Sequence, residues 1–299
     1  MSRAAGAHRI VITGAGGQVG AALAARATAE GRDVLALTSA QWDITDATHA
    51  QAAVRILRLG DVVVNCAAYT AVDAAESDAQ AAFAVNATGP GNVAAACVRA
   101  GARLIHLSTD YVFSGDFGGV PPHPYEPGEA TGPLSVYGRS KLAGERAVLA
   151  AAPDATVVRT AWVYTGAAGG DFVAVMRRLA VGDGAVEVVD DQIGSPTYVG
   201  DLVGALLQVA DVEVGARVLH AANSGAVSRY EQARAVFEEA GADPDRVRPV
   251  SSSARLRLAP RPAARPAYSA LSGAESERAG LSPLRGWRSA LAAALAGVR

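Results

Sequence analysis

The chain is poor in cysteine and lacks long hydrophobic runs. Its two cysteines, Cys66 and Cys97, lie in apolar surroundings and belong to no spaced cluster of the kind that binds zinc or forms a disulfide framework. No apolar run reaches the roughly 18 residues that a membrane-spanning helix needs. The run Ile10-Val11-Ile12 is too short for the core of a signal peptide. These absences predict a cytoplasmic protein with two buried, reduced thiols.

An excess of charge of either sign is also missing. The net charge is -2, which gives no reason to expect a nucleic acid or an anionic membrane as a partner. Half of the 299 residues are hydrophobic and 19% are charged, as is usual for a globular chain. A chain of this length can bury a large core, either as one compact body or as two lobes.

A glycine-rich turn near the N-terminus predicts a dinucleotide site. The β-branched run Ile10–Thr13 indicates a buried strand, Gly14-Ala15-Gly16-Gly17-Gln18-Val19-Gly20 follows, and residues 21–30 form an alanine-rich helical stretch. A strand, a glycine turn and a helix start bind pyrophosphate through free N–H groups and the helix dipole. The glycine spacing departs by one position from the usual pattern, so a tight turn without a ligand is the alternative.

The next strand bears on the choice of cofactor. Residues Val34–Leu37 end at Thr38 and Ser39, where NAD-binding proteins carry an acidic residue for the ribose 2′-hydroxyl. The nearest acidic residue is Asp43, and no arginine is present to hold a 2′-phosphate. We expect NADPH, with NADH as the alternative.

Tyr137, Lys141 and Thr109 are the candidate catalytic residues. A helix over 135–149 would place Tyr137 and Lys141 on one face, since they lie four residues apart. A neighbouring cation lowers the pKa of a tyrosine from about 10 and makes proton exchange easier. Thr109 ends an apolar run and would offer a second hydroxyl to a substrate oxygen. With a hydride carrier, these groups predict carbonyl reduction or alcohol oxidation; an ordinary surface helix is the alternative.

The alternation of segments predicts the fold class. Residues 61–65, 103–108 and 156–160 are predicted strands, and residues 76–100 are a predicted helix. The βαβα order predicts an α/β protein with a doubly wound parallel sheet of the Rossmann type.

The character of the sequence changes after about residue 164. We expect a dinucleotide-binding domain over 1–164 and a smaller, mainly substrate-binding lobe over 165–299, with a helix at 171–181 and a strand at 186–189. Residues 114–134, rich in Gly and Pro, predict a long loop that covers the site.

Several motifs together carry a family resemblance. They are Gly17–Gly20, Asn65–Asp73, Ser108–Phe113, Tyr137–Glu145, Arg159–Tyr164, Asp191–Thr197 and Arg265–Ser269. Nearly the whole chain resembles the extended short-chain dehydrogenase/reductase superfamily and, more closely, its family of dTDP-4-dehydrorhamnose reductases. Cys66 and Tyr69 stand where that family more usually has a small residue and a histidine.

The resemblance implies a reaction and a role for each catalytic residue. NADPH, or NADH, would reduce the C4 ketone of dTDP-4-dehydro-L-rhamnose, and the product dTDP-L-rhamnose would serve bacterial cell-wall and surface polysaccharide synthesis. Tyr137 would protonate the C4 oxygen, Lys141 would lower the pKa of Tyr137 and bind the nicotinamide ribose, and Thr109 would bond the carbonyl oxygen.

The resemblance also implies contact residues. The expected cofactor contacts are Gly14, Gly17, Gln18, Val19, Gly20, Asp43, Ile44, Ala67, Ala68 and Tyr69, together with Tyr137 and Lys141. The expected substrate contacts are Thr109, Asp110, Tyr111, Trp162 and Arg265, with Arg261 as a weaker candidate.

Some of these contacts have structural alternatives. Asp110 binds a sugar hydroxyl or forms a local turn, Trp162 stacks on the sugar or packs in the core, and Arg265 pairs with the diphosphate or is solvated. Asn86 orients groups near the nicotinamide or is a structural helix residue. Tyr111 stands where related dehydratases carry a glutamate, which disfavours dehydration.

Metal, partners and competing functions complete the expectations. Asp190 and Asp191 lack further spaced ligands, so no metal residue is assigned, and only the resemblance admits Mg²⁺ as an accessory ion. We expect a small-molecule nucleotide-sugar substrate and a monomer or homodimer. The alternatives are another nucleotide-sugar reductase or epimerase, and a non-catalytic NADP-binding regulatory subunit.

Overall fold

A six-stranded parallel sheet forms the centre of the molecule. The computed structural model describes residues 8–166, 169–212, 214–256 and 262–296. The strand order is β10-β5-β4-β3-β1-β2, and every neighbouring pair is parallel. The strands are β1 (Ile10–Thr13), β2 (Val34–Leu37), β3 (Val62–Asn65), β4 (Arg103–Thr109), β5 (Thr156–Thr160) and β10 (Val218–His220). The doubly wound α/β class predicted from the sequence is confirmed.

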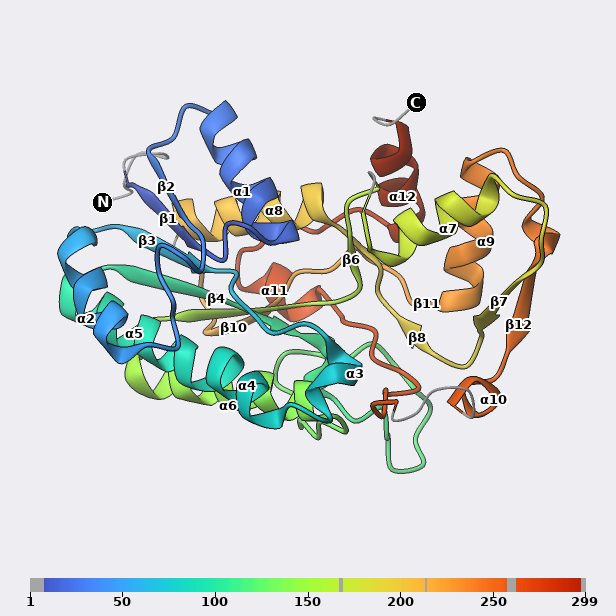
Figure 1. The fold of residues 1–299 in the computed structure, drawn as a ribbon, viewed down its shortest axis with the longest axis horizontal. Coiled ribbons are helices and arrows are strands. Elements are labelled where there is room, and N and C mark those ends of the chain that lie inside the picture. The colour runs from blue at the N-terminus through green and yellow to red at the C-terminus, as the bar shows by residue number, and fades with distance from the viewer. Residues whose placement is uncertain (1–7, 167–168, 213, 257–261, 297–299) are drawn as a thin grey trace.

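Helices cover both faces of this sheet (Figure 1). Ile10 and Ile12 face one layer, whereas Val11 between them faces the other, because side chains alternate along a strand. The first layer holds α1 (Gln18–Ala29) and α8 (Val199–Asp211), and the second holds α2 (Ala47–Ile56), α5 (Gly89–Ala100) and α6 (Val136–Ala151). Burial on both faces explains why these strands are continuous apolar runs.

The strand order reverses between β1 and β3, and this point locates the site. In an open α/β sheet the ligand crevice lies beyond the carboxyl ends of the strands at such a reversal. The turn after β1 and the segment after β3 therefore meet there. The carboxyl end of β4, where Thr109 lies, is next in order.

One predicted helix is wrong in its start and its regularity. In place of a helix over 76–100, the chain forms α3 (Val72–Ala75), α4 (Ala79–Phe83), a π-helical turn (Ala84–Thr88) and then α5. The Asp78 side chain accepts a hydrogen bond from the Ala81 N–H and caps α4, which begins three residues later than the predicted helix. The π turn carries Asn86, whose contacts are tertiary and have no local sequence cue.

A smaller α/β layer lies beside the sheet, at the right of Figure 1. Its core joins α7 (Phe172–Ala180), α9 (Arg229–Glu239), α12 (Trp287–Ala296) and the strand pair β7 (Val186–Val189) and β12 (Val247–Val250). The helix at 171–181 and the strand at 186–189 are confirmed. The functional division at residue 164 stays a prediction; in space, α8 and β10 lie with the central sheet.

The remaining elements are short. They are β6 (Val163–Tyr164), β8 (Ile193–Gly194), β9 (Thr197–Tyr198), β11 (Val227–Ser228), α10 (Ser252–Leu256), α11 (Ala274–Arg278) and the 3₁₀ turns Asp110–Val112 and Pro244–Arg246. Tyr125 of the fully described loop 114–134 stacks on Phe113 with ring centroids 4.1 Å apart. The role of this loop as a cover stays a prediction. Within the described ranges, no helix is long and apolar enough to cross a membrane.

Candidate active site

The glycine turn after β1 is shaped by close backbone contacts. Gly14 has a φ of +69°, and a Cβ atom on it would lie 2.5 Å from the Ala67 backbone nitrogen. A Cβ atom on Gly20 would lie 2.3 Å from the Gly14 carbonyl oxygen. Both positions therefore require glycine, and Gly17 caps α1 without a side chain over the free N–H groups. This backbone cradle fits the pyrophosphate of a dinucleotide.

The predicted catalytic residues line one cavity. Its volume is about 360 Å³. The lining residues are Gly17, Gln18, Val19, Cys66, Ala68, Thr70, Leu107, Ser108, Thr109, Tyr137, Lys141, Thr160, Ala161, Trp162 and Val163. The structure thus brings Thr109, Tyr137 and Lys141 together with the glycine turn. Their roles in turnover stay predictions.

Helix α6 carries Tyr137 and Lys141 into this cavity. The Ser135 hydroxyl accepts a hydrogen bond from the Gly138 N–H at 3.1 Å. This cap starts the helix at Val136, one residue before Tyr137. Lys141 is buried, and its Nζ donates to the Leu107 carbonyl oxygen at 2.6 Å. Burial lowers the pKa of Lys141 to about 8.

The electrostatics of Tyr137 differ from the sequence prediction. Burial raises the pKa of Tyr137 above its ordinary value, and the hydrogen bond shared with Thr109 only partly opposes this shift. The lysine ammonium bonds the Leu107 carbonyl, and the charges of Asp110 and Tyr111 add to the effect of burial on the phenol. The phenol therefore keeps its proton at neutral pH, which is the form that a proton donor needs.

Two buried hydroxyls in the cavity have no partner within the described part of the chain. They are Ser108 Oγ and Thr160 Oγ1, on the adjacent strands β4 and β5. A buried polar atom without a hydrogen bond is costly, so these hydroxyls are suited to bond a ligand in the cavity. Cys66 is a free thiol that also lines the cavity, and burial raises its pKa to about 12.

Asp110 is next to Thr109 in the chain but does not line the cavity. Its Oδ1 accepts from the Thr109 hydroxyl at 3.0 Å, and its Oδ2 accepts from the Ser269 hydroxyl at 2.6 Å. Burial raises the pKa of Asp110 to about 6, opposed by these hydrogen bonds. Both oxygens already have protein partners, so the arrangement favours a role in orienting Thr109 over a sugar contact. The neighbouring Tyr111 packs edge-on against Tyr137, with centroids 5.8 Å apart.

Other predicted contacts lie outside both cavities described in this section. The Arg265 guanidinium forms two 2.9 Å hydrogen bonds to the Asp73 carboxylate, so a protein anion already occupies it. The Asp43 carboxylate accepts from Thr45 in a local turn. The Ile44 side chain packs in the core. Arg261 lies outside the described residues.

Asn86 has a structural role in positioning the segment after β3. Its Oδ1 accepts from the Tyr69 N–H at 2.8 Å, and its Nδ2 donates to the Tyr69 carbonyl at 3.0 Å. The same Nδ2 donates to the Ser140 hydroxyl on α6 at 3.0 Å. Asn86 therefore ties the backbone of residues 67–69 to the helix that carries Tyr137.

The acidic pair at 190–191 forms no evident metal site. The Asp191 carboxylate accepts from the Ser252 N–H and hydroxyl. Among the described residues, no group of three or more His, Cys, Asp or Glu side chains could hold a metal ion. The structure adds no support for an accessory Mg²⁺.

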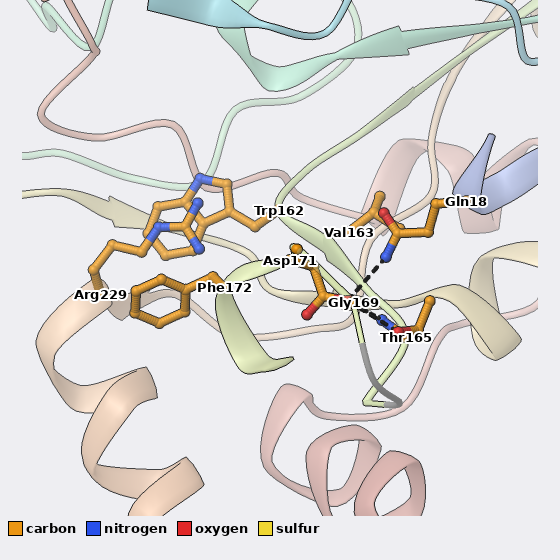
Figure 2. A pocket seen from close by; sticks show the side chains of 9 residues that line it. Gln18, Trp162, Val163, Thr165, Gly169, Asp171, Phe172 and Arg229 are labelled. Carbon is orange, nitrogen blue, oxygen red and sulfur yellow. Dashed lines mark hydrogen bonds between the residues drawn. The ribbon is translucent and has the colours of Figure 1, made fainter. Parts of the chain in front are cut away.

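A second cavity of about 570 Å³, drawn in Figure 2, adjoins the first. The two cavities share Gln18, Trp162 and Val163. Its other lining residues are Thr165, Gly169, Gly170, Asp171, Phe172 and Arg229. Trp162 has a φ of 48°, in the left-handed region that non-glycine residues rarely adopt. Such strain is found preferentially at functional sites.

Arg229 is the notable residue that sequence reasoning missed. Its local sequence signals only a helix start, because Ser228 and Glu231 form a capping box around it. Nothing in that pattern indicates that its side chain reaches Trp162, which lies 67 positions earlier (229 minus 162). Only the packing of α9 against the segment after β5 brings the two together.

Comparison with known proteins agrees with this geometry. The family model of the RmlD substrate binding domain matches residues 8–299. The chain belongs to this family. It is 68% identical to a dTDP-4-dehydrorhamnose reductase of Mycobacterium tuberculosis (strain CDC 1551 / Oshkosh), over 97% of this chain and 93% of that protein. It is 61% identical to a dTDP-4-dehydrorhamnose reductase of Mycolicibacterium smegmatis, over 98% and 86%.

A solved structure of this family shares the fold. It is the dTDP-4-dehydrorhamnose reductase of Bacillus anthracis in complex with NADP, with a TM-score of 0.89 and 35% identity. The match covers 97% of this chain and 99% of that one. The resemblance to extended short-chain dehydrogenases/reductases is confirmed.

Proposed function

We propose that the protein is an NADPH-dependent reductase that converts dTDP-4-dehydro-L-rhamnose to dTDP-L-rhamnose. The observation that carries the proposal is one cavity that joins a dinucleotide turn to Thr109, Tyr137 and Lys141. The reductases of the family, including the relative bound to NADP, support the choice of substrate and cofactor. Such a product would supply cell-wall and surface polysaccharide synthesis.

The residues present fit the dinucleotide. Gly14, Gly17 and Gly20 would hold the pyrophosphate on the N-terminus of α1, and the unpaired Ser108 and Thr160 hydroxyls offer hydrogen bonds deeper in the cavity. NADPH, when bound, supplies the hydride. Lys141 keeps further N–H donors beside the one bonded to Leu107, and these would bind a ribose hydroxyl.

Tyr137 and Thr109 would both form hydrogen bonds with the C4 ketone oxygen. The phenol of Tyr137 retains its proton because burial raises its pKa, and it would donate that proton to the C4 oxygen. Thr109 would hold the same oxygen by a hydrogen bond, once its single hydroxyl proton turns from the buried Asp110 carboxylate to the ketone. A charged Lys141 beside the pair would favour negative charge that develops on the phenol.

Consumption of NADPH tests this proposal. The purified chain is mixed with NADPH and dTDP-4-dehydro-L-rhamnose, with the GDP- and UDP-linked 4-keto sugars as matched substrates. Turnover confined to the dTDP sugar supports the proposed reaction, and turnover of another sugar shifts it to a different nucleotide-sugar reductase. Tight NADPH binding without turnover of any sugar would instead favour the non-catalytic regulatory subunit. Replacing NADPH by NADH measures the cofactor preference.

A further inference from the structure

Arg229 presents a guanidinium between two aromatic rings. Its Cζ lies 3.5 Å from the ring centroid of Trp162 and 4.8 Å from that of Phe172 (Figure 2). Ring contacts engage the faces of the planar guanidinium and leave its N–H edge for hydrogen bonds. One N–H donates to Gln232 Oε1 at 3.2 Å. The side chain is thus fixed in place and retains N–H donors that no residue in the described part of the chain accepts.

Arg229 differs from Arg159 and Arg265 in having no ion pair with a described carboxylate. Arg159 is bound by the Glu145 carboxylate at 2.9 and 2.7 Å, and Arg265 by Asp73 at 2.9 Å. Among the described residues, no carboxylate forms an ion pair with Arg229. Burial lowers the pKa of Arg229 to about 10; the nearby Tyr111 and Asp110 oppose this shift, and the charge of Arg265 adds to it. An anion at its free edge would offset the cost of this burial.

The carboxylate in the same cavity is already satisfied. Asp171 Oδ2 accepts from the Thr165 N–H at 3.1 Å, the Thr165 hydroxyl at 2.9 Å and the Gln18 side-chain amide at 3.2 Å. Its Oδ1 accepts from the Ala174 N–H at 2.9 Å and caps α7. These donors spread the negative charge of Asp171, so it repels a second anion less than a bare carboxylate would.

Arg229 lies in a cavity that adjoins the catalytic cavity. The two cavities share the wall formed by Gln18, Trp162 and Val163, so a ligand in one is adjacent to the other. The glycine turn already provides the cradle for a cofactor pyrophosphate. A second diphosphate, linked to a sugar whose C4 reaches Tyr137, would be stabilised by a cation in the adjoining cavity.

We propose that Arg229 binds the diphosphate of the nucleotide-sugar substrate in the second cavity. The inference rests on the proposed function, and it makes Arg229 a binding residue that helps to determine substrate specificity. Trp162 contributes by holding the guanidinium plane, which directs two N–H groups toward phosphate oxygens. Lysine at this position would keep the charge and lose that planar fork.

Titration calorimetry with dTDP and with thymidine tests the proposal. Both ligands are titrated into the full chain saturated with NADP⁺, for the wild type, Arg229→Met and Arg229→Lys. Arg234→Met is the matched control, because Arg234 lies on the same helix and pairs with Asp245 away from both cavities. NADPH binding is measured separately for each protein.

We expect Arg229→Met to weaken dTDP binding about tenfold to hundredfold and to leave thymidine binding within about twofold. Arg229→Lys should lose less, and Arg234→Met should match the wild type. Equal dTDP affinity in Arg229→Met, or an equal loss for thymidine, would overturn the proposal. A loss of NADPH affinity with unchanged dTDP affinity would also overturn it, by assigning Arg229 to the cofactor.

Two features keep this test decisive. Folding of Arg229→Met is checked by circular dichroism. If it does not fold, Arg229→Lys provides the test. Unchanged dTDP affinity in that variant, with an unchanged dependence of this affinity on salt concentration, would refute a bidentate contact. Failure of the wild type to reduce any 4-keto sugar would remove the proposed function. It would leave the comparison of dTDP with thymidine intact, because that measurement does not depend on turnover.

Discussion

The two adjoining cavities are assembled in different ways. The catalytic cavity draws Thr109, Tyr137 and Lys141 from one strand end and one helix, within a segment of 33 residues. The second cavity joins residue 18, residues 162–172 and residue 229, which are far apart in the chain. Spacing within one helix can be read from a sequence, whereas a meeting of distant segments cannot.

The cavities also differ in which groups they leave without a partner. The catalytic cavity has the unpaired hydroxyls of Ser108 and Thr160, the protonated phenol of Tyr137, and the Lys141 amine, which donates to the Leu107 carbonyl. The second cavity has the Arg229 cation, which no described carboxylate pairs. We therefore expect the ketone beside Tyr137 in the first cavity and, as proposed above, the substrate diphosphate beside Arg229 in the second.

The largest expected effect separates the cavities by chemistry. Tyr137→Phe removes the proton donor and should lower kcat about 10²- to 10⁴-fold. NADPH and dTDP affinities should stay within about twofold, because the phenol hydroxyl lies in neither anion site. Steady-state kinetics and calorimetry on the same preparation check both expectations. Undiminished kcat would eliminate Tyr137 as the acid.

The buried ion pair between Glu145 and Arg159 tests how much the stability of the fold depends on a buried charge pair. Glu145→Gln leaves a buried arginine without its anion and should cost about 3–5 kcal/mol in the free energy of unfolding. Urea unfolding provides the measurement. Glu238→Gln is the control, since its pair with Arg288 is exposed and should cost about 0–1 kcal/mol. Equal losses in the two variants would contradict the prediction.

The pH dependence of activity tests the charge on Lys141. Burial lowers the pKa of Lys141 to about 8, so kcat/KM should fall up to about tenfold per pH unit above that value. Arg does not titrate in this range, so Lys141→Arg should lose the fall near pH 8 even at a lower rate. A pH profile of the wild type identical to that of Lys141→Arg would refute the assignment.

The contribution of Lys141 to the free energy of unfolding should change with pH in the opposite direction to its effect on activity. Its folded pKa lies below the unfolded value, so between about pH 8 and 10.5 the unfolded chain binds more protons than the folded chain. Through this group alone, stability therefore rises with pH across that window, while activity falls. Urea midpoints of the wild type and Lys141→Met across the same window isolate this contribution.

The smallest expected effect concerns Arg265, the arginine predicted from the sequence to bind the diphosphate. Asp73→Asn weakens its bidentate partner and leaves Arg229 untouched. We expect a change in dTDP affinity of less than about twofold and a stability loss of about 0–1 kcal/mol, because the pair is partly exposed. A tightening of dTDP binding by tenfold would instead give Arg265 the diphosphate role.

The central sheet was predictable because its signals are local. Buried parallel strands appear as apolar runs, and the spacing of Tyr137 and Lys141 needs only the pitch of one helix. The helix over 76–100 was predicted wrongly, because Asp78 and Asn86 act through a cap and a tertiary contact. Arg265 was plausible by residue type alone, and its partner Asp73 lies 192 positions away.

The sequence by itself determined the α/β class, the glycine turn and the residues that can donate a proton. Each depends on neighbours along the chain, through strand alternation, helix pitch or the absence of a Cβ atom. The tertiary structure alone decided which charges are neutralised, which hydroxyls stay unpaired and that Trp162 stacks on Arg229. Those outcomes depend on the packing of distant segments, since burial and partner choice arise only when the chain has folded.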